Sequence, residues 1–235
     1  MDVKCIRSET TPQMRAEEYD RWYETSRGQW ISQLEYSLVS DALEVGPGQS
    51  LLDVGCGTGW FTRKFSGDPR LSVTGLDIDI VGLEFGRSKD PRSLYVQADA
   101  QRLPFPDNAF DRVVSIAALP FVADWPRAVA EIVRVSRDRF ALGLLNRHSL
   151  LWREKGRGKG VGAYRGAHWH TAGEITAVLR KLPVSAIRTQ SCVFLPSGRA
   201  YARALELMMP RSVPGGAFLV VSGRKNEAGF LKAAI

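Results

Sequence analysis

The 235-residue sequence has few of the residues that cross-link small secreted folds or hold structural metals. It contains three cysteines and three histidines, and Cys5, Cys56 and Cys192 are too scattered for a disulfide framework or a zinc site. We therefore expect a cytoplasmic protein. No segment approaches the roughly 20 consecutive apolar residues of a membrane helix, and residues 1–9 lack the apolar core of a signal peptide. We expect no membrane span.

The length suits one compact α/β domain with a full core. The formal net charge is +7, but it is unevenly distributed. Residues 1–146 carry 17 basic and 21 acidic side chains, whereas residues 147–211 carry 12 basic and 3 acidic ones. A basic C-terminal third can indicate an anionic substrate or nucleic acid. It can equally be a solvated face, so both interpretations stay open.

A glycine-rich stretch follows the first predicted strand. The apolar run at 51–54 ends in a carboxylate, Asp53, and three alternate glycines follow, Gly55, Gly57 and Gly59. Alternate glycines let a backbone turn tightly and approach a ligand. The dinucleotide fingerprint spaces its glycines differently, and an acid here would repel a pyrophosphate. The pattern therefore favours a ligand with a cationic group over a nicotinamide or flavin nucleotide.

The segment from Asp53 to Gly59, which includes Cys56, closely resembles motif I of class I S-adenosylmethionine-dependent methyltransferases. This resemblance implies a single Rossmann-like, doubly wound α/β domain. Its sheet would have seven mostly parallel strands, helices on both faces and a terminal antiparallel strand pair. It also implies S-adenosylmethionine as cofactor, S-adenosylhomocysteine as product, and cofactor contacts from Asp53, Gly55, Cys56, Gly57 and Gly59.

A second predicted strand, residues 71–77, again ends in an acid. Asp77 lies 18 residues after Gly59, a spacing that suits a carboxylate accepting hydrogen bonds from a ribose diol. Asp79 could compete for this role, but the resemblance favours Asp77, with Ile78 against the adenine.

Residues 97–111 form an irregular, proline-containing connection to a strand predicted at 110–116. This connection resembles a segment of the UbiE-like small-molecule methyltransferases, the type-11 methyltransferase group. There the acid matching Asp99 accepts a hydrogen bond from the adenine amino group. The resemblance adds Ala100 beside it, and Ser115 at the strand end that flanks the sulfonium.

The N-terminal residues 12–44 predict two helices broken near Arg27-Gly28. Tyr19, Trp22 and Tyr23 share one helical face, which is a pattern of core residues or of a lid. In related methyltransferases an N-terminal helical segment often covers the cofactor, so we expect Tyr19 and Trp22 to contact it.

Residues 147–170 are distinctive because they are rich in glycine and arginine. We expect a mobile, basic loop on the substrate side, although a plain surface insertion remains an alternative. His148, His168 and His170 lie at its borders. With Tyr164 they are weak candidates for a general base. No cysteine and few carboxylates are near, so we expect no metal site.

We therefore divide the chain into a helical lid at 1–44, a cofactor-binding core at 45–146, and a C-terminal completion of the same domain at 147–235. The predicted function is methyl transfer from S-adenosylmethionine to a small, possibly anionic acceptor. Two alternatives are a nucleic-acid methyltransferase that uses the basic third, and a non-catalytic cofactor-binding subunit. No Asn/Asp-Pro-Pro-Tyr/Phe tetrapeptide follows residue 116, and its absence disfavours base modification.

Overall fold

The computed structural model describes residues 12–226. Seven strands build one sheet: β1 (Ser50–Val54), β2 (Ser72–Asp77), β3 (Leu94–Gln97), β4 (Phe110–Ile116), β5 (Ser136–Leu145), β6 (Val184–Cys192) and β7 (Phe218–Lys225). The α-helices are α1 (Pro12–Glu24), α2 (Ser26–Leu43), α3 (Trp60–Ser66), α4 (Ile80–Lys89), α5 (Trp125–Val135), α6 (Ala172–Leu179) and α7 (Ala200–Met208). Short helical turns are η1 (Leu119–Phe121), η2 (Trp152–Gly156) and η3 (Gly162–Tyr164).

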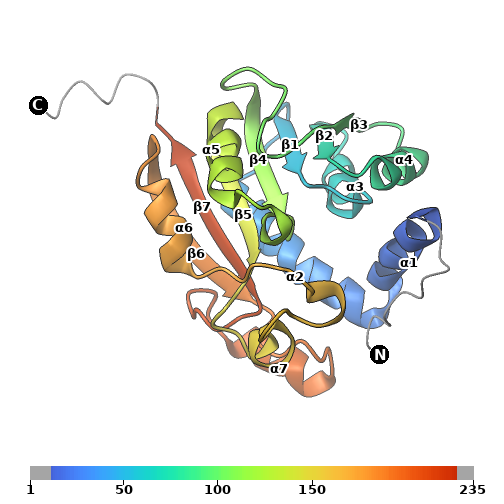
Figure 1. Cartoon of the computed structure of the whole chain (residues 1–235), viewed down its shortest axis with the longest axis vertical. Helices are drawn as coiled ribbons and strands as arrows, with labels where there is room; N and C mark the ends of the chain where they lie inside the picture. The colour runs from blue at the N-terminus through green and yellow to red at the C-terminus, as the bar shows by residue number, and fades with distance from the viewer. Residues whose placement is uncertain (1–11, 227–235) are drawn as a thin grey trace, which may run out of the picture.

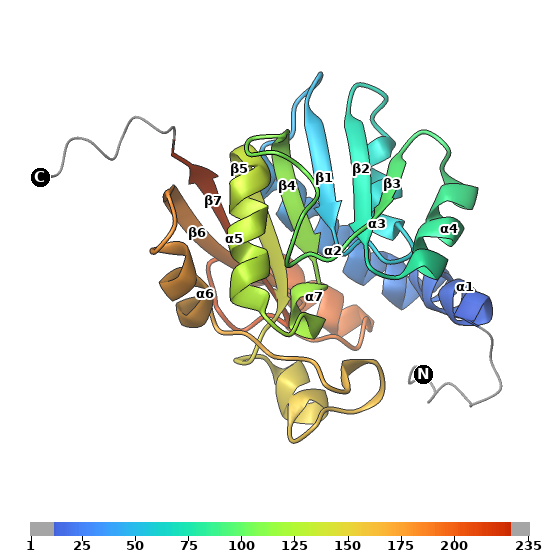
Figure 2. The ribbon, with the colours of Figure 1, turned by 45° about the horizontal axis from the view of Figure 1, so that its top comes forward.

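The strand order is β3-β2-β1-β4-β5-β7-β6, and Figure 2 shows the strands side by side. The pairs among β1 to β5 are parallel, whereas β7 runs antiparallel to both of its neighbours. This confirms the predicted Rossmann-like sheet with antiparallel pairing at its end. The chain winds outward in both directions from β1 and β4, and ligands of such sheets bind at that switch point.

Helices cover both faces of the sheet (Figure 1). On one face, α2 and α3 bury apolar side chains such as Leu38 and Phe65 against β1, β2 and β4. On the other, α5 and α6 bury Ile132 and Ile175 against the same sheet. Strands covered on both faces need nearly continuous apolar sequence, which explains the unbroken buried run at 140–145 of β5.

Helix α5 begins at an aspartate cap. Asp124 is its N-cap and accepts a hydrogen bond from the Arg127 N–H at 3.2 Å. The packing face is Ala128, Val129 and Ile132, each fully buried. Burial of a large aliphatic side chain of this kind contributes about 1.5–3 kcal/mol, so α5 fixes the β4–β5 half of the sheet.

The predicted break between the first two helices is displaced by two residues. The break is at Thr25, whose hydroxyl caps α2 by accepting from the Gly28 N–H at 3.0 Å. Gly28 is a buried residue inside α2. It must be a glycine, because a Cβ at this position would lie 2.1 Å from the Trp22 carbonyl oxygen. The glycine therefore permits close helix packing and does not end a helix.

The basic segment at 153–166 is folded into turns. It contains η2 and η3, and its backbone closes on itself, with Val161 N–H donating to the Lys155 carbonyl at 3.1 Å and Gly166 N–H to the Lys159 carbonyl at 2.9 Å. The expected mobility of this loop stays a prediction. Within residues 12–226, no helix combines the length and the apolar character that a membrane crossing requires.

Candidate functional site

A cavity of about 1000 Å³ opens at the carboxyl ends of β1, β2 and β4, which is the size of a small-molecule site. Its walls come from the glycine loop, the ends of these strands, α1 and η1. The lining includes Tyr19, Tyr23, Asp53, Gly55, Cys56, Gly57, Trp60, Asp77, Ile78, Asp99, Ala100, Ser115, Ala117, Leu119 and Phe121. The structure thus brings together most of the residues that the sequence predicts for a cofactor.

The three glycines of the loop have left-handed φ angles of 78°, 55° and 74°. A Cβ at Gly55 would lie 2.2 Å from the Ala118 Cβ, and one at Gly59 would lie 2.7 Å from the Tyr95 hydroxyl oxygen. A Cβ at Gly57 would meet no protein atom within 4 Å. Packing therefore requires the outer two glycines, whereas Gly57 leaves open space where the loop borders the cavity.

Asp77 holds this loop in place. One carboxylate oxygen accepts from the Gly57 N–H at 2.7 Å, and the other accepts from the Asp79 N–H at 2.9 Å. Asp79 in turn caps α4 by accepting from the Val81 N–H at 3.1 Å. The two acids therefore differ in role: Asp79 begins a helix, and Asp77 presents its carboxylate beside the glycine loop.

Asp53 is almost fully buried below the loop. Its carboxylate accepts from the Thr62 hydroxyl at 2.7 Å, and burial raises the pKa of this group from 3.8 to about 7. Burial likewise raises the pKa of the neighbouring Cys56 thiol well above its usual value. Cys56 is therefore a neutral thiol, and it lacks the lowered pKa that a reactive cysteine requires.

Two further residues complete the wall near the strand ends. Asp99 accepts from the Gln101 backbone N–H at 2.8 Å, and this bond and the Gln101 side chain lower the pKa of Asp99. The Ser115 hydroxyl is fully buried, faces the cavity and makes no hydrogen bond within the described chain. Ala117 has a φ of 55°, a strained conformation for a non-glycine residue that is typical of functional sites.

Helix α1 covers part of the cavity, but with a different aromatic pair from the one predicted. Tyr19 and Tyr23 line it, and their hydroxyls lie 3.1 Å apart. Tyr23 also stacks on Trp60 at a centroid distance of 4.7 Å. Trp22 packs against the hydrophobic core and is not among the cavity residues. Trp22 and Tyr23 share the helical face that the sequence identified. The helical period alone therefore could not show which of these two rings would line the cavity.

A buried ion pair that the sequence did not reveal ties α1 to the glycine loop. Both carboxylate oxygens of Asp20, in α1, accept hydrogen bonds from Arg63 Nη2, at 2.7 and 2.9 Å. Asp20 also accepts from the hydroxyl of Thr58, a loop residue, at 2.9 Å. Asp20 is separated from these partners by about forty positions in the sequence, so no local pattern could indicate it.

The four candidates for a general base do not line the cavity. His148 and His168 are exposed, His170 is buried behind η1, and Tyr164 packs beside Trp169 with 5.4 Å between ring centroids. Glu35 of α2 also lies outside the cavity lining, and burial raises its pKa to about 8.

Part of the chain is similar to known methyltransferases. Residues 52–139, the segment that supplies the glycine loop and the three strand-end acids, match the model of the type-11 family described as a methyltransferase domain. This segment of the chain is thus similar to methyltransferase domains.

Curated relatives match the same region. The chain is 38% identical over 100 residues to a demethylmenaquinone methyltransferase of Renibacterium salmoninarum, covering 43% of this chain and 42% of the relative. It is 31% identical over 149 residues to a malonyl-[acyl-carrier protein] O-methyltransferase of Erwinia pyrifoliae, covering 60% of this chain and 54% of the relative. The matches thus span about half the length of these relatives.

A solved structure agrees over a longer range. A methyltransferase of Thermotoga maritima, described as a possible histamine N-methyltransferase, has a TM-score of 0.72 at 23% identity. The likeness covers 91% of this chain and 97% of that one. At this identity it concerns the fold, and it extends the methyltransferase architecture beyond residue 139.

Proposed function

We propose that this chain transfers a methyl group from S-adenosylmethionine to a small-molecule acceptor. The observation that carries the proposal is the meeting of Asp53, Asp77 and Asp99 in one cavity. They lie at the ends of β1 and β2 and just beyond β3, around a glycine loop. Three carboxylates suit a ligand that carries a cationic amine, a ribose diol and an exocyclic amine, and they disfavour a dinucleotide pyrophosphate.

The cavity fits this cofactor at three places. The open space at Gly57 leaves room for a ligand against the loop backbone. The unpaired hydroxyl of Ser115 is a buried polar group that a ligand can satisfy. The Asp77 carboxylate keeps lone pairs beyond its two backbone contacts, because each oxygen can accept more than one hydrogen bond. We propose that Asp77 binds the ribose and Asp99 the adenine.

The rest of the cavity suits an acceptor with an aromatic or apolar part. Tyr19, Tyr23, Trp60, Phe61 and Phe121 form its aromatic lining. The relatives act, by their names, on demethylmenaquinone and on the malonyl group of a carrier protein, both small-molecule moieties. The basic side chains of 153–166 do not line the cavity, so any role in attracting an anionic acceptor would act at longer range.

The proposed chemistry depends mainly on orientation. S-adenosylmethionine supplies a methyl group on a sulfonium, which leaves as a neutral thioether. The residues around it must hold the acceptor in line and exclude water, and good positioning alone can contribute several kcal/mol to lowering the barrier. The hydrogen-bonded pair Tyr19 and Tyr23 can orient a polar acceptor group. Burial raises the pKa of Tyr23, so this hydroxyl stays protonated and able to donate.

The experiment is transfer of an isotope-labelled methyl group from S-adenosylmethionine into a fractionated cell extract, with Asp77→Ala as the matched inactive variant. We expect label in the small-molecule fraction with the native chain alone. Label that is removed by nuclease would support the nucleic-acid alternative. Tight cofactor binding without transfer to any fraction would support a non-catalytic subunit and contradict the proposal.

A further inference from the structure

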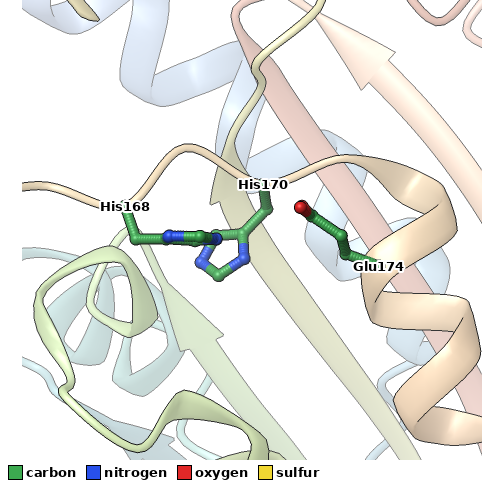
Figure 3. A group of neighbouring side chains, drawn as sticks. All are labelled: His168, His170 and Glu174. Atoms are coloured by element: carbon green, nitrogen blue, oxygen red, sulfur yellow. The ribbon is translucent and has the colours of Figure 1, made fainter. Parts of the chain in front are cut away.

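Behind η1, three potential metal ligands come together. Their donor atoms, from His168, His170 and Glu174, all lie within 4.8 Å of one another. The two histidines precede α6 and the glutamate is in its first turn, and Figure 3 shows the imidazole rings and the carboxylate converging on one space. Glu174 also belongs to the capping box that begins α6. This local role gives no sign that its carboxylate lies beside two histidines.

The backbone fixes all three residues. His170 makes a parallel bridge to Asn146, donating from its N–H to the Leu145 carbonyl at 2.9 Å. The His168 N–H donates to the Pro120 carbonyl of η1 at 2.7 Å. Glu174 is held by a capping box in which one carboxylate oxygen accepts from the Thr171 N–H at 2.8 Å. The ligand atoms are therefore preorganised on three anchored positions.

The His170 side chain indicates that something else belongs here. It is completely buried, yet neither ring nitrogen has a hydrogen-bond partner within the described chain. An unsatisfied buried polar group of this kind destabilises the fold unless it gains a partner. The Trp125 ring packs edge-on against the His170 ring, with 4.9 Å between the ring centroids. The centroid of the His168 ring lies 4.5 Å from that of His170.

We propose that His168, His170 and Glu174 form a binding site for a divalent transition-metal ion of the zinc class. Two imidazole nitrogens and one carboxylate oxygen are a donor set that Zn²⁺ accepts, with a fourth position for water. Ligand bonds of about 2.0–2.2 Å require the donors to draw slightly closer together than they are. The exposed ring of His168 can supply most of this movement by a small change in its side-chain torsion angles.

One contact competes with the ion. Arg147 donates to the Glu174 carboxylate at 3.3 Å, and its side chain is 49% exposed. Exposed ion pairs contribute little to stability, so a metal ion can displace the guanidinium. The site would join the end of the basic segment to α6 and, through His168 and Pro120, to η1. Since Leu119 and Phe121 of η1 line the cofactor cavity, the ion would stiffen that wall.

The test is titration of the tag-free, metal-stripped full chain with Zn²⁺ by calorimetry, and with Co²⁺ by visible absorption. A Cys5→Ser parent removes the thiol that lies outside the described residues. We expect one ion per chain with an affinity in the low-micromolar range or better, and a rise in Tm with Zn²⁺. His168→Ala and Glu174→Gln should each weaken binding by more than about tenfold.

Two variants separate a built site from chance coordination. Glu174→Gln keeps the capping box, because glutamine can replace glutamate in it, so its loss of affinity would not reflect a damaged helix. His148→Ala removes an exposed histidine outside the cluster and should bind Zn²⁺ as the parent does. Absent stoichiometric binding, or binding that His148→Ala weakens as much as His168→Ala, would overturn the proposal. These readouts do not depend on methyl transfer.

Discussion

The ion pair between Asp20 and Arg63 allows the expected role of α1 as a lid to be tested. Asp20→Ala removes the acceptor of both Arg63 bonds and of the Thr58 hydroxyl. The two charged side chains are only 8% and 16% exposed, so Arg63 would remain largely buried without its counter-charge. Breaking a buried pair in this way typically costs about 3–5 kcal/mol.

Most of that cost should appear locally. Helix α1 packs mainly on α2 and α4, so it can detach while the sheet stays folded. An increase of about 3 kcal/mol in the tendency to open corresponds to roughly a 150-fold larger open population. We therefore expect much faster amide exchange in α1, a smaller change in Tm, and weaker cofactor binding because Tyr19 and Tyr23 leave the cavity wall.

Hydrogen exchange measured by mass spectrometry, with and without S-adenosylhomocysteine, provides the assay. The control is Glu17→Ala, one turn earlier on the same helix, where the carboxylate is exposed and lies 4.0 Å from Arg21. Exchange in α1 that rises equally in both variants, or in neither, would refute the assignment of Asp20 as the residue that docks the lid.

Three further predictions concern Asp53, Gly57 and the basic segment at 153–166. Because the pKa of Asp53 is raised from 3.8 to about 7, the folded ligand-free chain binds a proton that the unfolded chain has released. Its stability should fall as the pH rises from about 4 to 7, and urea unfolding of Asp53→Asn should lack that component. Gly57→Ala should fold with a loss of about 1–2 kcal/mol, because of its left-handed φ, yet bind no cofactor by calorimetry; normal binding would contradict the loop assignment. Charge reversal at Arg157 and Lys159 should raise KM for an anionic acceptor and leave cofactor affinity unchanged, and an unaltered KM would reduce this segment to a solvated insertion.

The sequence predicted the sheet, and the meeting of acids and glycines at one edge of it, because that information is local. Strands end in acids, glycines follow at fixed spacing, and the chain alternates between strand and helix. Asp53, Gly57 and Asp77 could therefore be assigned from short motifs. Parallel strands then bring their carboxyl ends to one edge, so the motifs converge without further information.

Residues that depend on tertiary packing could not be assigned in this way. Asp20 acquires its role only when α1 meets Arg63, and the choice of Tyr23 over Trp22 follows from stacking on Trp60. Glu174 has an evident local function as a helix cap, which hid its position beside two histidines. The sequence analysis placed the helix break near Gly28 because glycine commonly ends a helix. The break is at Thr25, and Gly28 is needed for close contact with Trp22.

The most direct test of the central claim is the calorimetric titration of S-adenosylhomocysteine into the native chain, Asp77→Ala and Asp107→Ala. Asp107 is a suitable control because its carboxylate is 69% exposed and paired with Arg134, outside the cavity. We predict that Asp77→Ala loses about 1–3 kcal/mol of binding free energy, the range for a charged hydrogen-bond acceptor, while Asp107→Ala binds as the native chain does. Equal affinity in all three, or preference for a nicotinamide dinucleotide, would contradict the account.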